Sequence, residues 1–314
     1  MYDKVKLWLD RSVIGGEFST IADYLTKATE QTDRQTGETK VFGCLEGLKV
    51  SIFCTGISIV GSLSKYMYGN NIYPLDRHTT KEAVGKLADA LHTDVSKADV
   101  TGLEFGAVFL LSQRVPNYLE RLGDMPKLVR LHFEENTLYY RTKAKAQPQT
   151  LAFYDKLAEQ RQNGVKLPVG FEGQNLLKYE LRLNRRLPKQ LNVREVKAST
   201  LSEKQFYKML LRLWQNKYFS ISKQEQVKTN IMSEIKTVSD AFEVFVARLM
   251  AVSNKDAVAG FIDELKEAKV FQDRNNYTRL RKKIQAVASK AGLMQTDELI
   301  KELDDAVKNQ GAYL

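Results

Sequence analysis

Two residues of this chain, a tyrosine and a lysine two positions apart, are of types well suited to covalent chemistry. They are Tyr154 and Lys156, in the stretch 150–156 (TLAFYDK), which reads as a short β-strand. Strand side chains alternate between the two faces of a sheet, so both should point to the same side. A phenol is a candidate nucleophile, and a nearby ammonium stabilises its charge. We interpret the two as a catalytic pair; the alternative is a packed aromatic residue.

Two glutamates lie on other stretches that alternate like strands. Glu104 is in 100–109 (VTGLEFGAVF), between two glycines, and Glu180 is in 176–184 (LLKYELRLN). Two carboxylates with an amide or a histidine can hold Mg²⁺ or Mn²⁺, and such an ion polarises a phosphodiester. We predict a metal site at Glu104 and Glu180, with His132 as a third candidate ligand. The alternatives are an exposed strand glutamate at a bulge for Glu104 and a hydrogen-bonded structural histidine for His132.

Positive charge is concentrated around these residues. The chain has a net charge of +10, and the segment 141–197 contains 13 Lys and Arg against 5 Asp and Glu. Such a cluster favours a polyanionic substrate, of which nucleic acid is the commonest, although a solvated basic surface is the alternative. Tyr139 and Tyr140 would stack on unpaired bases or simply fill the sheet surface. The candidate DNA-binding cations in this segment are Arg141, Lys143, Lys178 and Arg182.

Strand-like alternation occupies the first two thirds of the chain and helical periodicity the rest. Strands are expected at 4–10, 39–48, 49–60, 100–109, 128–134, 137–143, 150–156 and 176–184, and helices near 20–28, 80–92 and 116–122. After residue 199, apolar spacing predicts helices near 202–217, 223–236, 238–252, 255–268, 276–290 and 296–309. The predicted fold class is therefore α+β, with an antiparallel-sheet domain over 1–197 followed by an all-α C-terminal domain over 198–314.

Composition and cysteine content point to a protein of the cytoplasm. The 314 residues are 43% hydrophobic and 27% charged, which is ordinary for a globular chain with its own core. Cys44 and Cys54 are too few for a disulfide framework, and we expect both to be buried thiols. The first residues alternate like a strand, and no segment reaches a membrane-spanning length, so no membrane partner is expected.

Several weak motifs, in a fixed order, resemble the filamentous-phage gene II/X family of phage and plasmid replication initiators. The opening DKVKL at 3–7 resembles the start of that family. The order then continues with GSLSK at 61–65, GNN at 69–71, the Leu103-Glu104 strand, TLAFYDK at 150–156 and LKYELRL at 177–183. The resemblance covers roughly residues 1–195. It implies a nuclease domain related to the HUH fold of rolling-circle initiators.

The resemblance implies a replication initiator that nicks one DNA strand at an origin. A tyrosine would join the 5′ phosphate and leave a 3′-OH primer for rolling-circle replication. Tyr154 matches the family's nucleophile, Lys156 its nearby lysine, and Glu104 and Glu180 its acidic positions. Lys65, Asn70 and Asn71 match the glycine-bounded motif and imply contacts to DNA phosphates or the metal.

The sequence also departs from the family pattern. The family has a histidine where Asn70 stands and an arginine where Gly102 stands, and related nucleases use a histidine pair that this chain lacks. Two other functions therefore stay open: a mobilisation relaxase with the same chemistry, and a DNA-binding replication regulator without cleavage. In each case the partner is single-stranded or melted DNA. The C-terminal domain would recognise duplex or assemble copies, and a host helicase or polymerase is a further candidate partner.

Overall fold

The computed structural model divides the chain into two units. It describes residues 1–143, 148–165, 170–223, 225–227, 235–252, 255–273, 275–288 and 294–311. One unit comprises Met1–Ser222 and the residues from Asp304 onward, and the other comprises Lys223–Leu303. The first unit is built on an antiparallel sheet, so the α+β class is confirmed. The division does not fall at residue 197, where the sequence placed it.

Ten strands form the sheet of the first unit, in the order β2-β3-β4-β5-β1-β6-β10-β9-β8-β7. Every neighbouring pair is antiparallel. The central strands β1, β6 and β10 come from distant parts of the sequence, and the side chains of Lys178 and Asp3, 175 residues apart, meet across them. The strands are β1 (Tyr2–Asp10), β2 (Thr26–Thr32), β3 (Thr39–Leu45), β4 (Leu48–Phe53), β5 (Gly56–Ser62), β6 (Asp99–Leu111), β7 (Leu128–Phe133), β8 (Thr137–Thr142), β9 (Gln149–Asp155) and β10 (Asn175–Asn184).

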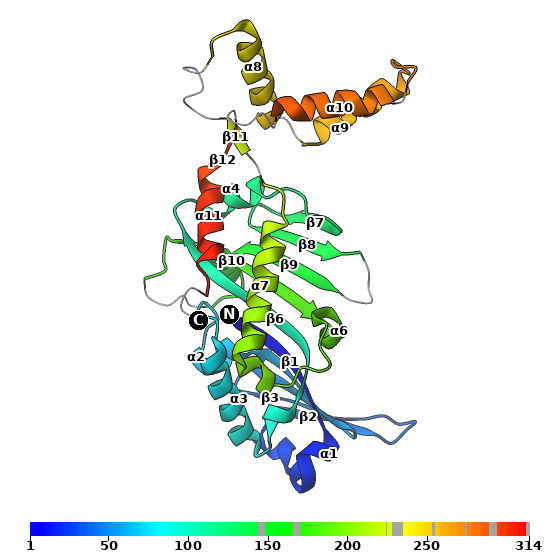
Figure 1. Ribbon diagram of the computed structural model, residues 1–314. Helices are drawn as coiled ribbons and strands as arrows, with labels where there is room; N and C mark the ends of the chain where they lie inside the picture. The colour runs from blue at the N-terminus through cyan, green and yellow to red at the C-terminus, as the bar shows by residue number, and fades with distance from the viewer. Residues whose placement is uncertain are drawn as a thin grey trace. The chain divides into compact units, whose positions relative to one another are not determined.

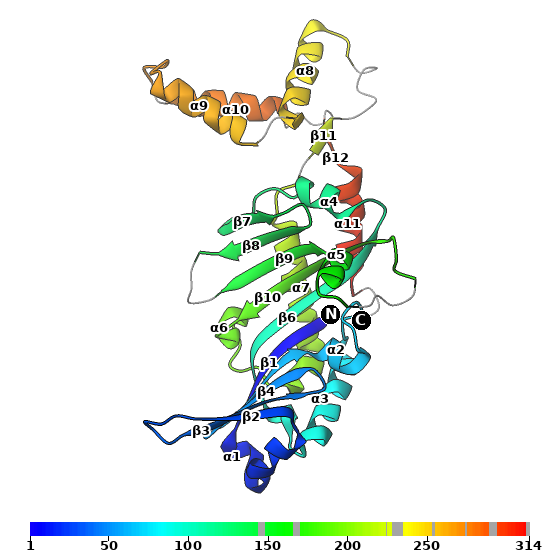
Figure 2. The same ribbon diagram turned by 180° about the vertical axis from the view of Figure 1, so that it is seen from behind.

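Helix α7 (Lys204–Phe219) crosses one face of the sheet, which we call the covered face (Figure 1). The opposite, open face is seen from behind, with α5 (Lys156–Gln162) near one end of the central strands (Figure 2). The remaining helices of this unit are α1 (Arg11–Ile14), α2 (Leu63–Tyr68), α3 (Arg77–Leu91), α4 (Val115–Arg121) and α6 (Leu187–Leu191), with 3₁₀ segments at Gly15–Tyr24, Val95–Lys97 and Ser199–Ser202.

An aromatic stack fixes α7 on the covered face. The ring of Tyr179 lies parallel to that of Phe153, with centroids 4.3 Å apart, and Trp214 of α7 stacks at 4.7 Å from Tyr179. The Tyr179 hydroxyl donates to the Trp214 carbonyl at 2.9 Å. All three side chains are buried. Large aromatic residues dominate the energetics of such cores, which explains why α7 belongs with the sheet and not with a separate helical domain.

The last helix, α11 (Glu298–Lys308), also contributes to the first unit through its final turns. The Tyr218 hydroxyl donates to Asp304 at 2.8 Å, and the Gln215 amide donates to the Val307 carbonyl at 3.1 Å. The predicted C-terminal domain is thus divided: its first helix and the end of its last one pack with the sheet.

Among its described residues, the second unit contains three whole helices, the first turns of α11 and a short strand pair. Its helices are α8 (Val238–Val252), α9 (Lys255–Glu267) and α10 (Asn275–Ala288), and α10 contacts both of the others. Strands β11 (Glu225–Val227) and β12 (Met294–Thr296) pair antiparallel. The helix predicted at 223–236 contains strand β11, and most of its other residues lie outside the described part. This unit is therefore not purely helical.

Other local predictions also differ from the structure. The helix expected at 20–28 is instead the end of a 3₁₀ segment followed by β2, and the two strands expected over 39–60 are three. Cys44 is half-buried and Cys54 is exposed, so neither is a fully buried thiol. Among the described helices, none is long and apolar enough to span a bilayer.

Gly106 of β6 lets two central strands approach closely. It faces Glu180 across the sheet, and a Cβ added at Gly106 would lie 2.2 Å from the Tyr179 carbonyl oxygen and 2.6 Å from the Glu180 Cα. At Gly102, the other glycine that flanks Glu104, an added Cβ would lie 2.9 Å from the Lys6 Cδ. The glycines around Glu104 therefore make room for neighbouring protein groups.

We expect Gly106→Ala to destabilise the protein by roughly 2 kcal/mol, because backbone atoms of β10 must move to accept the methyl group. The matched control is Gly85→Ala in α3, where an added Cβ has nothing within 4 Å. That control should be neutral or stabilising by about 0.5–1 kcal/mol, as expected for alanine in a helix. Urea unfolding followed by circular dichroism measures both; equal stabilities would contradict the close approach.

Candidate active site

Cross-strand pairing aligns the predicted site residues in three rows on the open face. Side chains paired directly across antiparallel strands lie on the same face, about 5 Å apart. Each row runs from β8 through β9 and β10 to β6. The rows are Thr137, Tyr154, Lys178 and Val108; Tyr139, Ala152, Glu180 and Gly106; and Arg141, Thr150, Arg182 and Glu104.

A third carboxylate, Asp3, joins this face through an irregularity in β1. Strict alternation would place Asp3 beside Val5 on the covered face. The register shifts between Tyr2, which pairs with Phe105, and Val5, which pairs with Leu103, so two residues of β1 stand opposite Glu104. Such bulges re-aim side chains. The sequence contains no local signal of this bulge, and Asp3 was therefore not among the predicted ligands.

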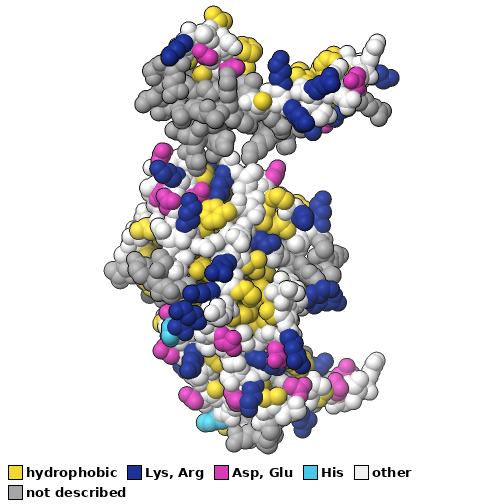
Figure 3. Space-filling view, in the orientation of Figure 1, with side chains coloured by type: hydrophobic (Ala, Val, Ile, Leu, Met, Phe, Trp, Pro, Cys, Tyr) yellow, Lys and Arg dark blue, Asp and Glu magenta, His cyan; other side chains and the backbone are white. Residues whose placement is uncertain are grey.

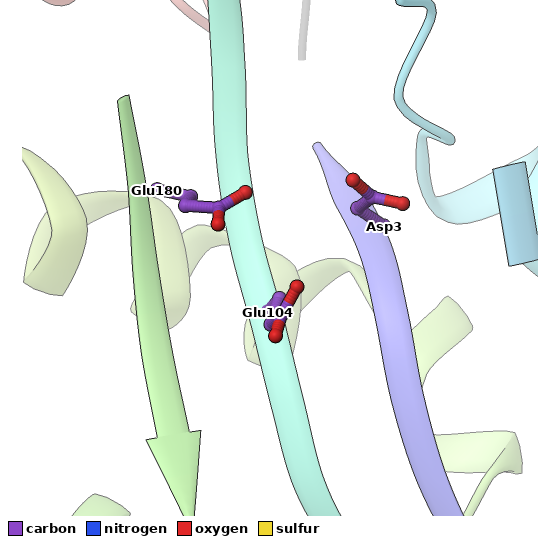
Figure 4. Close-up of side chains that lie close together, drawn as sticks. All are labelled: Asp3, Glu104 and Glu180. Atoms are coloured by element: carbon purple, nitrogen blue, oxygen red, sulfur yellow. The ribbon is translucent and has the colours of Figure 1, made fainter. Parts of the chain in front are cut away.

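The three carboxylates come from the adjacent strands β1, β6 and β10 and converge on one side of the sheet (Figure 4). Asp3, Glu104 and Glu180 each offer an oxygen, and these oxygens lie within 4.8 Å of one another. Asp3 and Glu180 are buried, and Glu104 is half-buried. Clustered carboxylate oxygens are the ligands that Mg²⁺ and Mn²⁺ prefer, so the donor set fits such an ion.

Two cations already neutralise part of this cluster. Lys178 forms ion pairs with Asp3 and, at 3.2 Å, with Glu180, while the Arg182 Nε donates to Glu180 at 2.6 Å. Burial opposes the ionisation of Glu180, but Lys178 and Arg182 outweigh it and lower its pKa. Burial likewise opposes ionisation of Asp3, and Lys178 lowers the pKa of that carboxyl. Both acids are therefore held as carboxylates.

Glu104 is the least neutralised acid of the three. Its only ion pair among the described residues is with Arg182, at 3.9 Å. Burial and the nearby Glu180 raise its pKa. Arg182 and, more weakly, Lys4 act in the opposite direction. Glu104 is therefore the carboxyl of this cluster whose negative charge is least compensated by neighbouring cations.

The Tyr154 phenol points into the same cluster. Its hydroxyl donates to the Glu180 Oε2 at 3.4 Å, a long hydrogen bond, and the side chain is 9% exposed. Burial, followed by the charge of Glu180, raises the pKa of Tyr154 well above its usual value. The phenol is thus protonated and sits beside a carboxylate that can accept its proton.

Lys156 does not extend the strand as predicted. The β9 strand ends at Asp155, whose side chain caps α5 by accepting from the Leu157 and Ala158 amides at 2.9 Å. Lys156 is the first residue of that helix and lies with its Nζ 5.9 Å from the Tyr154 ring centroid. Tyr154 and Lys156 are close to each other, as predicted, but the start of a helix and not strand alternation brings them together.

Asn71 links Lys156 to the carboxylates. Its amide nitrogen donates to Asp3 at 3.1 Å, and its oxygen accepts from Lys156 at 2.9 Å and from Gln160 at 3.1 Å. Lys156 is fully buried and pairs with Glu159 at 2.6 Å. Burial and the neighbouring Lys178 lower the pKa of Lys156. Glu159 and Gln160 lie on helix α5, so alternation along a strand gives no sign of them.

Several predicted residues lie away from this cluster. His132 pairs with Leu138 on the covered side of the sheet, so its proposed role as a metal ligand is wrong. Tyr140 is buried on that same side and donates to the Gly123 carbonyl at 2.7 Å. Asn70 closes a turn through the Ile72 amide at 3.1 Å. Lys65 and Lys143 are exposed on α2 and after β8, respectively.

The predicted DNA-binding cations therefore have different surroundings. Lys178 and Arg182 are engaged in the cluster, whereas Arg141 is exposed at the end of β8. On the side that carries α7, Lys and Arg side chains are spread over the first unit and do not gather into one patch (Figure 3). On the open face, Arg141 and Arg182 both lie over the Tyr139 ring.

Comparison with known proteins identifies the family. The family described as the N-terminal part of the replication-associated protein encoded by phage gene II matches residues 34–202, more than half of the chain. The chain belongs to this family, the filamentous-phage gene II replication initiators. The match includes Glu104, Tyr154 and Glu180 but begins after Asp3. No curated protein matches the chain significantly.

We expect Lys178→Met to destabilise the initiator by about 3–5 kcal/mol, because the change leaves Asp3 and Glu180 buried without their shared cation. The control is Lys97→Met, which removes an exposed pair with Asp94 at 3.1 Å and should cost about 0–1 kcal/mol. Chemical unfolding of the two purified variants compares them directly. A Lys178→Met protein as stable as Lys97→Met would show that the pairing is dispensable.

Proposed function

We propose that the protein nicks one DNA strand at a replication origin through Tyr154. The observation that carries this proposal is the contact of the Tyr154 hydroxyl with Glu180 inside a cluster of three carboxylates and two cations. A nucleophile, a proton acceptor and charge-stabilising groups are the parts that phosphoryl transfer needs. Membership of an initiator family supports the same chemistry.

In the proposed step, the Tyr154 oxygen attacks the phosphorus while the bond from phosphorus to the 3′ oxygen breaks. The phenolic proton passes to Glu180, and the departing 3′ oxygen ends as a hydroxyl after taking up a proton. The products are a 5′-phosphotyrosine link and a 3′-OH primer, so the bond energy is kept for rejoining. Lys178 and Arg182 hold Glu180 ionised, which keeps it able to accept the proton.

We further propose that Asp3, Glu104 and Glu180 hold a divalent metal ion, Mg²⁺ or Mn²⁺. The converging oxygens and the unrelieved charge of Glu104 support this assignment. When bound, the ion would polarise the phosphodiester and offset negative charge on the phosphoryl oxygens. Lys156 and Asn71 would then act as positioning residues, because Asn71 donates to Asp3 and is itself held by Lys156.

The DNA substrate would be single-stranded or melted, since a tyrosine on a sheet face reaches a phosphodiester more easily outside the duplex. Extension of the primer would call for a host polymerase and helicase. The second unit would recognise the origin duplex or assemble copies of the initiator. A mobilisation relaxase would use the same step on a transfer origin.

Two observations favour a second function, a DNA-binding replication regulator that does not cut. Tyr154 is only 9% exposed, and the cluster contains no histidine among the described residues. A nicking enzyme must expose this phenol when DNA binds, whereas a regulator need not. The two functions therefore differ in whether Tyr154 ever becomes joined to DNA.

Incubation with labelled origin-containing single-stranded DNA and Mn²⁺ should give a covalent adduct on a denaturing gel. We expect Tyr154→Phe to abolish the adduct, because the attacking oxygen is gone. The control is Tyr24→Phe, which changes a partly exposed tyrosine at the end of the 3₁₀ segment Gly15–Tyr24 and should leave the yield unchanged. An adduct with Tyr154→Phe would assign another nucleophile; binding without any adduct from wild type would favour the regulator.

Mn²⁺ binding should depend on Glu104. We expect Glu104→Gln to weaken Mn²⁺ binding at least roughly tenfold in calorimetric titration, because it removes the carboxylate with the least neutralised charge. Glu46→Gln is the control, since Glu46 is exposed and pairs only with Lys86 at 2.6 Å among the described residues. Unchanged affinity in the Glu104 variant would move the metal site elsewhere.

A further inference from the structure

An aromatic and cationic group lies beside the carboxylate cluster on the open face and, apart from Arg182, has no part in the step above. Arg141 is placed with its Cζ 4.6 Å from the Tyr139 ring centroid, and the Arg182 Cζ lies 5.7 Å from the same centroid. Phe133 of β7 meets Tyr139 edge to face at 5.6 Å. Phe133 is 49% exposed, and Arg141 is exposed as well. Large rings and guanidinium planes thus remain accessible at the edge of the sheet.

The strand register connects this group to the site. Tyr139 and Glu180 lie in one row, with only the small side chain of Ala152 between them. Tyr139 and Glu180 are thus two inter-strand spacings apart, which corresponds to about 10 Å between their backbones. Stacked nucleotides rise by about 3.4 Å each, so this span matches roughly two or three of them. Arg182 belongs to both groups, because it contacts Glu180 and faces Tyr139.

The positive charge of the exposed Arg141 is typical of a binding surface and not of a packed core. Among the described residues, Arg141 forms no ion pair, and its guanidinium instead stacks over rings. Bases stack on aromatic rings and on arginine planes, and every base has such a face. Cations beside the rings would contact the phosphates that flank a stacked base.

We propose that Phe133, Tyr139, Arg141 and Arg182 form a platform that stacks an unpaired base of the DNA strand next to the nicking site. The inference rests on the proposed function, which supplies the strand, and deepens it by naming the residues that hold an unpaired base. The platform accepts bases with little sequence preference. It therefore selects melted DNA over duplex, whose bases are already stacked on one another.

The test compares two fluorescent probes, the oligonucleotide dT12 and a 12-mer of the same backbone in which every base is absent. The protein is the full chain with Tyr154→Phe, so that the probes stay intact. We expect Tyr139→Ala to weaken dT12 binding roughly tenfold and to leave binding of the abasic 12-mer unchanged. Tyr139→Phe should retain dT12 affinity, because the ring is kept. Arg141→Lys should lose part of it, because the charge remains but the plane is lost.

Tyr24→Ala is the matched control, since Tyr24 is another partly exposed tyrosine of the same unit, where it packs against His92. An equal loss on both probes would mean an electrostatic or structural role for Tyr139 and would overturn the platform, as would unchanged dT12 affinity. Those results leave the nicking proposal intact if the protein that retains Tyr154 still forms the adduct. Conversely, a base-dependent loss in a protein that never forms the adduct would support the platform and reject nicking.

Discussion

The buried lysine Lys178 is the group on which the rest of the site depends. It contacts Asp3 and Glu180, which come from distant parts of the sequence and from strands separated only by β6. Burial by itself would lower the pKa of this ammonium, but Glu180, Tyr154 and Asp3 raise it well above its usual value. The pairing makes it possible to keep two carboxylates ionised inside the sheet. Without it, Asp3 and Glu180 would be buried carboxylates that lack their shared cation.

The positions of these groups follow from two departures from a regular sheet. The bulge in β1 turns Asp3 from the covered face to the open one, and Gly106 allows the backbone of β10 to come close enough for Glu180 to share that space. With regular alternation in β1, Asp3 would lie on the covered face and could not join Glu104 and Glu180. Local irregularity therefore creates the cluster, while the regular rows on either side position the tyrosine and the arginines.

The sequence predicted well what depends on alternation along one strand. Side chains in β6, β9 and β10 follow period two, as predicted, and the pairing of these strands then brings Glu104, Tyr154, Lys178, Glu180 and Arg182 to one face. It could not reveal which strands become neighbours, so His132 was assigned to the site although β7 turns it to the other face. Asp3 was missed because a bulge breaks the period that the prediction relied on. Helix α7 was assigned to a separate domain because amphipathic spacing shows that a helix packs, but not what it packs against.

The groups around Tyr154 have opposite effects on the ionisation of its phenol. In the free protein, burial and Glu180 raise its pKa, whereas Lys178 and Arg182 act in the opposite direction. On the proposed function, a phosphodiester that enters the cluster adds negative charge beside those two cations and beside any metal at Glu104. On this proposal, Glu180 would accept the proton of the phenol, whose oxygen lies 3.4 Å from it. Proton transfer would then be coupled to DNA binding, because that carboxylate and the cations Lys178 and Arg182 belong to one ion-pair network.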